Sequence, residues 1–82
     1  MTEKEARQRI AGMPINSRLQ LIMKNGTIQD VMLASHDTGG TNEKVYDNLT
    51  VPALPPAIIV TGKRWGTYRI NTEDIVSIAR VG

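Results

Sequence analysis

The residues with the clearest chemistry in this sequence are Lys63, Arg64 and Trp65, which follow one another between two β-prone runs. Two cations attract phosphate, and an indole offers a π face for a nucleobase, worth roughly 1–3 kcal/mol per stacked base. The same residues also fit a structural role, in which Trp65 packs across a subunit boundary or closes its own domain while the cations stay solvated. The segment therefore indicates either a nucleic-acid contact or a packing tryptophan.

A second polar cluster starts at His36 and Asp37 and continues through the turn-forming residues 38–42. An imidazole can stack on a base or donate a hydrogen bond to phosphate. A single histidine beside a turn is more often a structural hydrogen-bonding residue. We therefore include His36 as a candidate RNA contact, with the structural role as its alternative.

Residues for catalysis or metal binding are scarce. The chain has no cysteine and one histidine, and it has no nucleophile-elbow serine and no phosphate-cradling glycine pattern followed by lysine. Glu73 and Asp74 are adjacent, so their side chains diverge in an extended chain and suit turn or cap positions. The sequence predicts a protein that is not an enzyme, with no metal, cofactor or small-molecule substrate.

Length and charge set further bounds. A chain of 82 residues forms one domain, residues 1–82, which buries only about 60% of its unfolded surface, and oligomerisation would relieve that shortage. The net charge of +2 is concentrated toward both ends, which attracts phosphate weakly, although a solvated surface is the commoner meaning of so small an excess. Without a signal-like start or an apolar run of roughly 20 residues, we expect a cytoplasmic protein with no membrane partner.

The elements that must position these residues are mostly strands. Asn25-Gly26 lies between two apolar runs and predicts a hairpin with a type I′ turn. Leu19, Leu21 and Met23 share one face of the first strand. In the run after the turn, apolar residues occupy both parities, so we expect that strand to be covered on both sides.

The remaining segments complete the order of elements. Thr2 and Glu5 have the spacing of a capping box, which predicts a short helix over about residues 2–11 that forms a lid on the sheet. Strands are predicted over 44–51, over 57–61 and 67–71 as a hairpin or one bulged strand, and over 75–81. Three prolines in 52–56 indicate a loop at an edge. Tyr46 and Tyr68 are predicted to pack on a sheet face.

One helix followed by about five strongly bent antiparallel strands suggests a small barrel rather than a sandwich at this length. The predicted fold is all-β with a short N-terminal helix: a small five-stranded antiparallel SH3-like barrel over about residues 16–81.

Two motifs resemble those of the Sm and Sm-like (LSm, Hfq-type) family of RNA-binding proteins. The first has the family's glycine-to-aspartate spacing and comprises Leu19, Leu21, Gly26, Ile28, Leu33 and Asp37. The second runs from Ile70 to Ile78 as a strand, a tight turn and an aliphatic last strand. With the leading helix, the resemblance covers nearly the whole chain and implies the Sm fold.

The resemblance also implies where RNA would bind. Family members use the loop after the second strand, with a stacking side chain and an asparagine, and an Arg-Gly turn before the last strand. Here Asp37 matches, the stacking position falls on Gly39, Asn42 lies one residue late, and Asn71-Thr72 replace Arg-Gly. The expected RNA-binding residues are therefore His36, Asp37, Asn42, Lys63, Arg64, Trp65, Asn71 and Thr72.

Family members close a ring of about five to seven subunits by pairing their last two strands with neighbours, which also removes unpaired sheet edges. We take the strand over residues 75–81 as the candidate edge, and the interface candidates are Ile70, Ile75, Val76, Ile78 and Val81. The leading hypothesis is a homo-oligomeric ring that binds single-stranded RNA without catalysis, as an RNA chaperone or scaffold. The second is a protein-interaction or structural ring that has lost RNA binding, with 52–56 as a partner-facing loop. The third is a monomeric peptide-binding SH3-like module.

Overall fold

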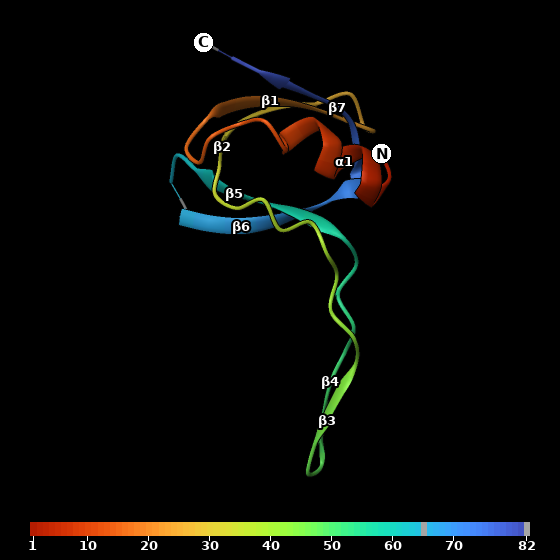
Figure 1. Cartoon of the computed structure of the whole chain (residues 1–82). Helices are drawn as coiled ribbons and strands as arrows, with labels where there is room; N and C mark the ends of the chain where they lie inside the picture. The colour runs from red at the N-terminus through yellow and green to blue at the C-terminus, as the bar shows by residue number, and fades with distance from the viewer. Residues whose placement is uncertain (65, 82) are drawn as a thin grey trace.

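A computed structural model describes residues 1–64 and 66–81. Five antiparallel strands form one sheet in the order β6-β5-β2-β1-β7, and β3 and β4 form a separate two-stranded hairpin. The sheet folds over, so that β1, β2 and β7 lie above β5 and β6, while β3 and β4 project away from it (Figure 1). The elements are α1 (Glu3–Ile10), β1 (Arg18–Met23), β2 (Ile28–Leu33), β3 (Lys44–Tyr46), β4 (Leu49–Val51), β5 (Ala57–Gly62), β6 (Gly66–Asn71), the 3₁₀ turn η1 (Thr72–Asp74) and β7 (Ile75–Arg80).

The core lies inside the folded sheet, and α1 covers it. Alternate residues of β1 point inward, as the sequence predicts, and Leu21 has no exposed surface. The helix adds Ala6 and Ile10, both fully buried. The predicted capping box is confirmed, because the Thr2 hydroxyl accepts from Glu5 N at 3.2 Å while the Glu5 carboxylate accepts from Thr2 N at 3.3 Å. The short, mostly polar helix is thus held by its cap and by docking.

The hairpin predicted at Asn25-Gly26 is confirmed, but its turn is longer than predicted. Gly26 N donates to the Met23 carbonyl, and Met23 N donates to the Thr27 carbonyl, each at 2.9 Å. Residues 24–26 therefore form a three-residue loop, in which only Gly26 has a positive φ, +87°. A type I′ turn would need Asn25 in that region too.

The second strand is covered on one side only. Val31 and Leu33 are buried, whereas Ile28 and Met32 on the other face are exposed. The expectation that both faces would be covered is therefore wrong for the isolated chain.

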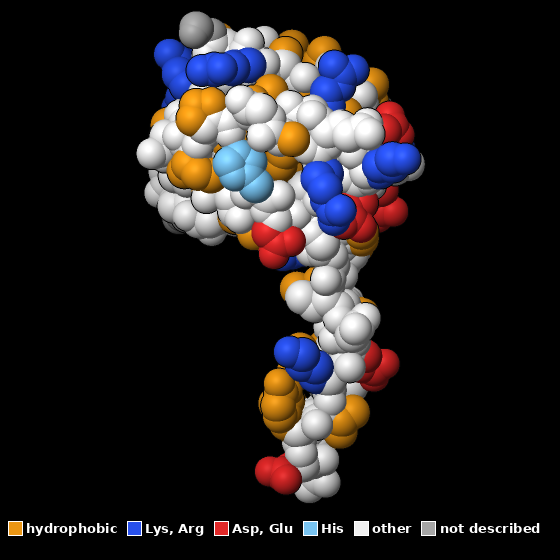
Figure 2. All heavy atoms as spheres, in the orientation of Figure 1, with side chains coloured by type: hydrophobic (Ala, Val, Ile, Leu, Met, Phe, Trp, Pro, Cys, Tyr) orange, Lys and Arg blue, Asp and Glu red, His pale blue; other side chains and the backbone are white. Residues whose placement is uncertain are grey.

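The single strand predicted over residues 44–51 is also wrong, because this segment turns back on itself. β3 and β4 pair with Tyr46 opposite Leu49, and Asp47 at the turn adopts a φ of +51°, which aspartate tolerates better than most side chains. The same register extends to a bridge between Thr41 and Leu54. We call residues 41–54 the arm and the rest of the chain the head; the arm accounts for the long 48 Å axis, against 25 and 24 Å across (Figures 1 and 2).

The head is a curved sheet with two free edges. The two alternatives left open for residues 57–71 resolve into a hairpin, with β5 and β6 paired from Ala57–Asn71 to Gly62–Gly66. Within the described residues no ladder joins β6 to β7, so the predicted mostly β architecture is confirmed while the closed barrel is not formed. The last strand is an edge, as expected from the sequence.

Candidate functional site

The structure separates the predicted RNA-binding residues into two groups. Lys63 and Arg64 follow β5 at the Gly62–Gly66 end of its hairpin with β6, whereas Asn71 lies at the opposite end, paired with Ala57. The two ends of β5, Ala57 and Gly62, are five residue steps apart, a distance of about 16 Å. A single contact point cannot include both groups.

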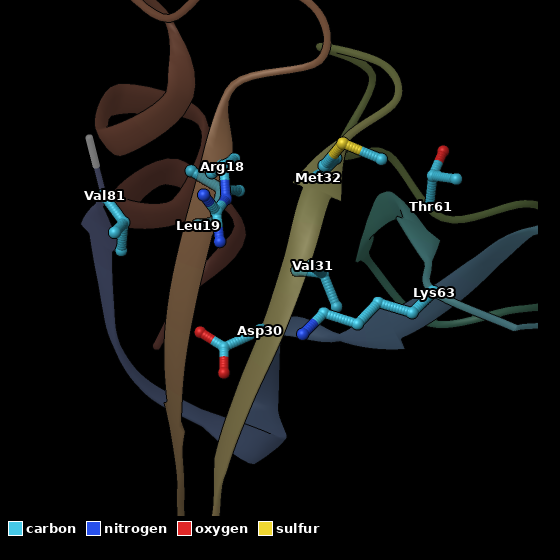
Figure 3. A pocket seen from close by; sticks show the side chains of 8 residues that line it. All are labelled: Arg18, Leu19, Asp30, Val31, Met32, Thr61, Lys63 and Val81. Atoms are coloured by element: carbon cyan, nitrogen blue, oxygen red, sulfur yellow. The ribbon is translucent and has the colours of Figure 1, made fainter.

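Lys63 and Arg64 form the first group, which we call the basic end of the head. Lys63 and Arg64 are exposed, and Trp65 lies outside the described residues. Lys63 reaches toward β2 across a pocket of about 230 Å³ (Figure 3). The pocket brings residues from β1, β2, β5 and the C-terminal segment together, and its lining comprises Arg18, Leu19, Asp30, Val31, Met32, Thr61, Lys63 and Val81.

The pocket combines an apolar floor with a charged rim. Met32 is exposed and Val81 is half-buried, so these two side chains offer the apolar surface, while Leu19 and Val31 belong to the core beneath it. Arg18 and Lys63 supply two cations at the rim, against the single carboxylate of Asp30. Such a site suits a large apolar or aromatic group that carries, or lies beside, a negative charge.

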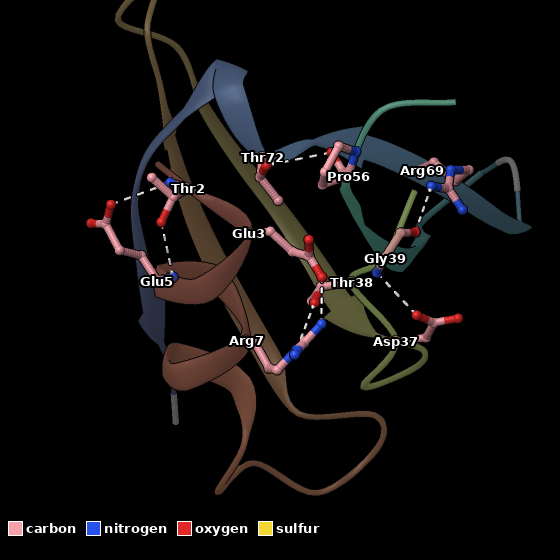
Figure 4. Close-up of polar contacts among 10 residues, drawn as sticks. All are labelled: Thr2, Glu3, Glu5, Arg7, Asp37, Thr38, Gly39, Pro56, Arg69 and Thr72. Atoms are coloured by element: carbon pink, nitrogen blue, oxygen red, sulfur yellow. Dashed lines mark hydrogen bonds and ion pairs between the residues drawn. The ribbon is translucent and has the colours of Figure 1, made fainter. Parts of the chain in front are cut away.

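The second group consists of Asp37, Asn71 and Thr72 and lies where the arm leaves the head. We call this region, residues 37–40, 55–57 and 69–72, the root. Thr38 is almost fully buried there; its carbonyl accepts from Ala57 N at 3.2 Å, and its hydroxyl accepts from Arg7 Nε at 3.3 Å (Figure 4). Arg7 also forms an ion pair with Glu3, one turn earlier in α1. The helix is therefore tied to the root.

Arg69 holds together the two segments of the chain that meet at the root. Its guanidinium donates to the carbonyl of Gly39 at 3.3 Å (Figure 4). It also donates to the carbonyl of Pro55 at 3.2 Å. These carbonyls belong to the segments entering and leaving the arm, so one side chain fixes the direction of both. Sequence reasoning missed Arg69, because a single arginine in a β-prone run carries no signal of what it contacts.

The predicted RNA contacts at the root are mostly engaged within the chain. The Asp37 carboxylate accepts from Gly39 N at 3.0 Å, which shapes the turn. The Thr72 hydroxyl is buried and donates to the Pro56 carbonyl at 3.4 Å. His36 Nε2 lies 2.6 Å from the Met13 carbonyl, and since a carbonyl only accepts, the ring nitrogen donates.

The two remaining asparagines differ in position. Asn71 is half-buried at the end of β6, and Asn42 is exposed on the arm. The structure therefore brings Asp37, Asn71 and Thr72 near the root and leaves Asn42 beyond it. Tyr68 packs on the core as predicted, but Tyr46 is exposed on the arm, which corrects the prediction for that residue.

The interface candidates also divide. Ile70, Ile75 and Ile78 are buried in the core of their own chain, so their side chains are not available to a neighbour. Val76 is exposed and Val81 is half-buried. Any contact along these edges therefore uses backbone groups and Val76 rather than the three isoleucines.

One carboxyl group has a shifted pKa. The backbone hydrogen bond from Thr2 holds the pKa of Glu5 below its ordinary value, and the Thr2 hydroxyl, the N-terminal charge and Arg9 act in the same direction. In the described part of the chain no helix is long and apolar enough to cross a membrane. Residues 1–64 and 66–81 contain no cluster of three or more potential metal-binding side chains.

Comparison of the chain with protein-family models, with curated proteins and with solved structures finds no match in any of the three.

Proposed function

We propose that this protein is an Sm-like subunit that assembles with copies of itself into a ring and binds single-stranded RNA without catalysis. The observation that carries this proposal is the pair of free edges, β6 and β7, at the two ends of one curved sheet. A chain with a free edge at each end of its sheet can pair head to tail with identical neighbours, and such heterologous pairing closes a ring when the rotation allows. By the resemblance of its motifs, the ring would contain about five to seven subunits.

Burial supports assembly as well. A single chain of this size leaves much of its apolar surface in water. Ile22 and Ile28 lie on the outer face of β1 and β2, and Val76 lies on the outer face of β7; all three are exposed. Pairing at the edges would place neighbouring sheets side by side and cover part of this face.

For RNA, the basic end is the better candidate of the two groups. Lys63 and Arg64 are exposed at a hairpin tip and Arg18 lies beside them, so their charges are available to phosphate. In contrast, Asp37 and Thr72 already use their polar atoms within the chain. The ring would therefore hold RNA through phosphate attraction at the basic end, with Trp65 as the candidate stacking side chain.

A second function follows from the same observation. Asp37 and Thr72, two of the positions that would contact RNA in the resembling family, already form hydrogen bonds within the chain. If the basic end serves protein contacts instead, the assembly is a structural or interaction ring.

The test has two measurements. Light scattering first gives the mass of the assembly, and fluorescence anisotropy then measures the binding of labelled oligo-U and oligo-A at several salt concentrations. We expect a ring, and affinity that falls with salt. In the double variant Lys63→Ala/Arg64→Ala, the slope of log affinity against log salt should decrease in magnitude by about 1.4, because each single-strand phosphate contact contributes roughly 0.7.

The matched control is Lys4→Ala/Lys24→Ala, which removes the same charge from exposed positions of the helix and the β1–β2 loop. It should keep the slope. A monomer at micromolar concentration would contradict the ring, and a ring without oligonucleotide binding would favour the structural alternative.

A further inference from the structure

The arm exposes apolar side chains on both of its faces. Tyr46 and Leu49 pair on one face and are 56% and 65% exposed, and Val45 on the other face is 68% exposed. Figure 2 shows hydrophobic side chains at the surface of the arm, away from the head. An isolated two-stranded hairpin is marginally stable in water, so an arm of this composition needs a surface to pack on.

The geometry of the root excludes the pocket of the same molecule as that surface. The arm enters β5 at Ala57, whereas the pocket lies at the other end of β5, at Thr61 and Lys63. Arg69 hydrogen-bonds to both segments of the root, and Figure 1 shows the arm running away from the sheet. The arm is therefore held pointing away from the head.

The pocket of a second copy matches the arm in size and charge. At about 230 Å³ it exceeds the roughly 150 Å³ that suffices for a benzene ring, so it can take the Tyr46 side chain. The arm carries Lys44 against Glu43 and Asp47, an excess of one negative charge. The pocket rim has the opposite excess, since Arg18 and Lys63 face Asp30. Asp47 directly follows Tyr46, so the tip would bring its carboxylate to that rim.

We infer that the arm of one copy docks into the pocket of a second copy, with Tyr46 in the pocket and Asp47 at the Arg18 side of the rim, which leaves Lys63 and Arg64 to the phosphate contacts proposed above. This contact uses neither β6 nor β7, so it goes beyond the pairing of edges proposed above. In a ring it would act as a second fastening between subunits.

The absence of cysteine allows a direct test. Leu49→Cys, which keeps Tyr46 in place, and Thr61→Cys are prepared separately, mixed with a mild oxidant and separated on a non-reducing gel. The linked peptides are then identified by mass spectrometry, because either preparation alone can also give a dimer of the same mass. We expect a disulfide between positions 49 and 61 in a product at twice the 9.0 kDa chain mass, because Leu49 lies opposite Tyr46 on the same face of the arm and would approach Thr61 of the second copy. The matched control pairs Thr61→Cys with Val45→Cys, on the opposite face of β3, and should give little product.

Equal product from the two pairs, or none from either, overturns the inference. Light scattering of the wild-type protein separates this failure from that of the ring: a ring without the product between positions 49 and 61 leaves the ring standing, and a monomer without it overturns both.

A second measurement does not depend on cysteine geometry. The variant Tyr46→Ala/Leu49→Ala should weaken self-association roughly ten-fold or more, as expected for a central aromatic anchor and its neighbour. Val45→Ala/Thr50→Ala, on the other face, is the control. If Tyr46→Ala/Leu49→Ala instead weakens oligo-U binding and leaves the mass unchanged, the arm contacts nucleic acid and the inference is wrong.

Discussion

The molecule contains two β-hairpins of similar sequence character in opposite environments. β1 and β2 are rich in apolar residues and bury one face, whereas β3 and β4 are also rich in apolar residues but leave every residue exposed. The difference lies in what surrounds them: β1 and β2 each pair with a further strand, while β3 and β4 pair only with each other in the described structure. The comparison teaches that apolar, β-prone residues specify a strand without specifying that the chain itself covers it.

The largest expected effect compares one leucine from each hairpin. Leu21→Ala opens a cavity in the core and should lower the free energy of unfolding by about 2–5 kcal/mol. Leu49→Ala, on the arm, should change it by no more than about 0.5 kcal/mol, since the side chain is mostly in water. Urea denaturation of both variants, at a protein concentration low enough to prevent association, checks the difference.

Hydrogen exchange sharpens the same comparison. Amides of β1 should exchange only through global unfolding, and those of β3 through local opening of the arm. A destabilisation by Leu49→Ala as large as that by Leu21→Ala would show that the arm packs on its own head in solution.

Much of the head could be predicted because its signals are local. The capping box at Thr2, the hairpin at Gly26 and the inward face of β1 each depend on neighbouring residues or on a period of two. The arm could not be predicted in the same way. Asp47 at a positive φ is a weak turn signal beside Asn25-Gly26, so residues 44–51 read as a continuous strand.

The site was predictable only in part, for a related reason. The exposure of Lys63 and Arg64 was predictable, because consecutive charges at a turn are exposed whatever the fold. The pocket that joins Lys63 to Arg18 depends on strands far apart in the sequence, and so does the contact of Arg69 with Gly39 and Pro55. Such contacts follow from topology, which a single sequence specifies weakly.

The next effect concerns the boundary between the two regions. Gly40 lies where the two segments of the root pass close to each other. A Cβ at this position would overlap the Leu54 carbonyl oxygen and lie 3.1 Å from atoms of Pro55 and Pro56. Because these are backbone atoms, Gly40→Ala should force the root apart, lower the free energy of unfolding by about 1–3 kcal/mol and speed exchange of the arm amides. Thermal unfolding and hydrogen exchange measure the two effects.

Gly12→Ala is the matched control, since a Cβ at Gly12 would meet no atom within 4 Å. It should leave stability unchanged or slightly higher. If Gly40→Ala were equally silent, the root would be looser than its hydrogen bonds indicate, and the fixed direction of the arm would lose its support.

The smallest effect is a pH dependence confined to the head. Because the pKa of Glu5 is lowered in the folded protein, its carboxylate contributes stability that is present above the ordinary value of 4.5 and is lost as the pH falls through the lowered pKa. Glu5→Gln can still accept from Thr2 N but does not titrate, so the acid-side decrease in stability should become shallower. Glu43→Gln, which removes a carboxylate from the arm, should keep the decrease seen in the wild type. Melting temperatures of the three proteins between pH 3 and 6 test this, and a shallower profile for Glu43→Gln alone would place the relevant carboxylate on the arm instead of at the helix cap.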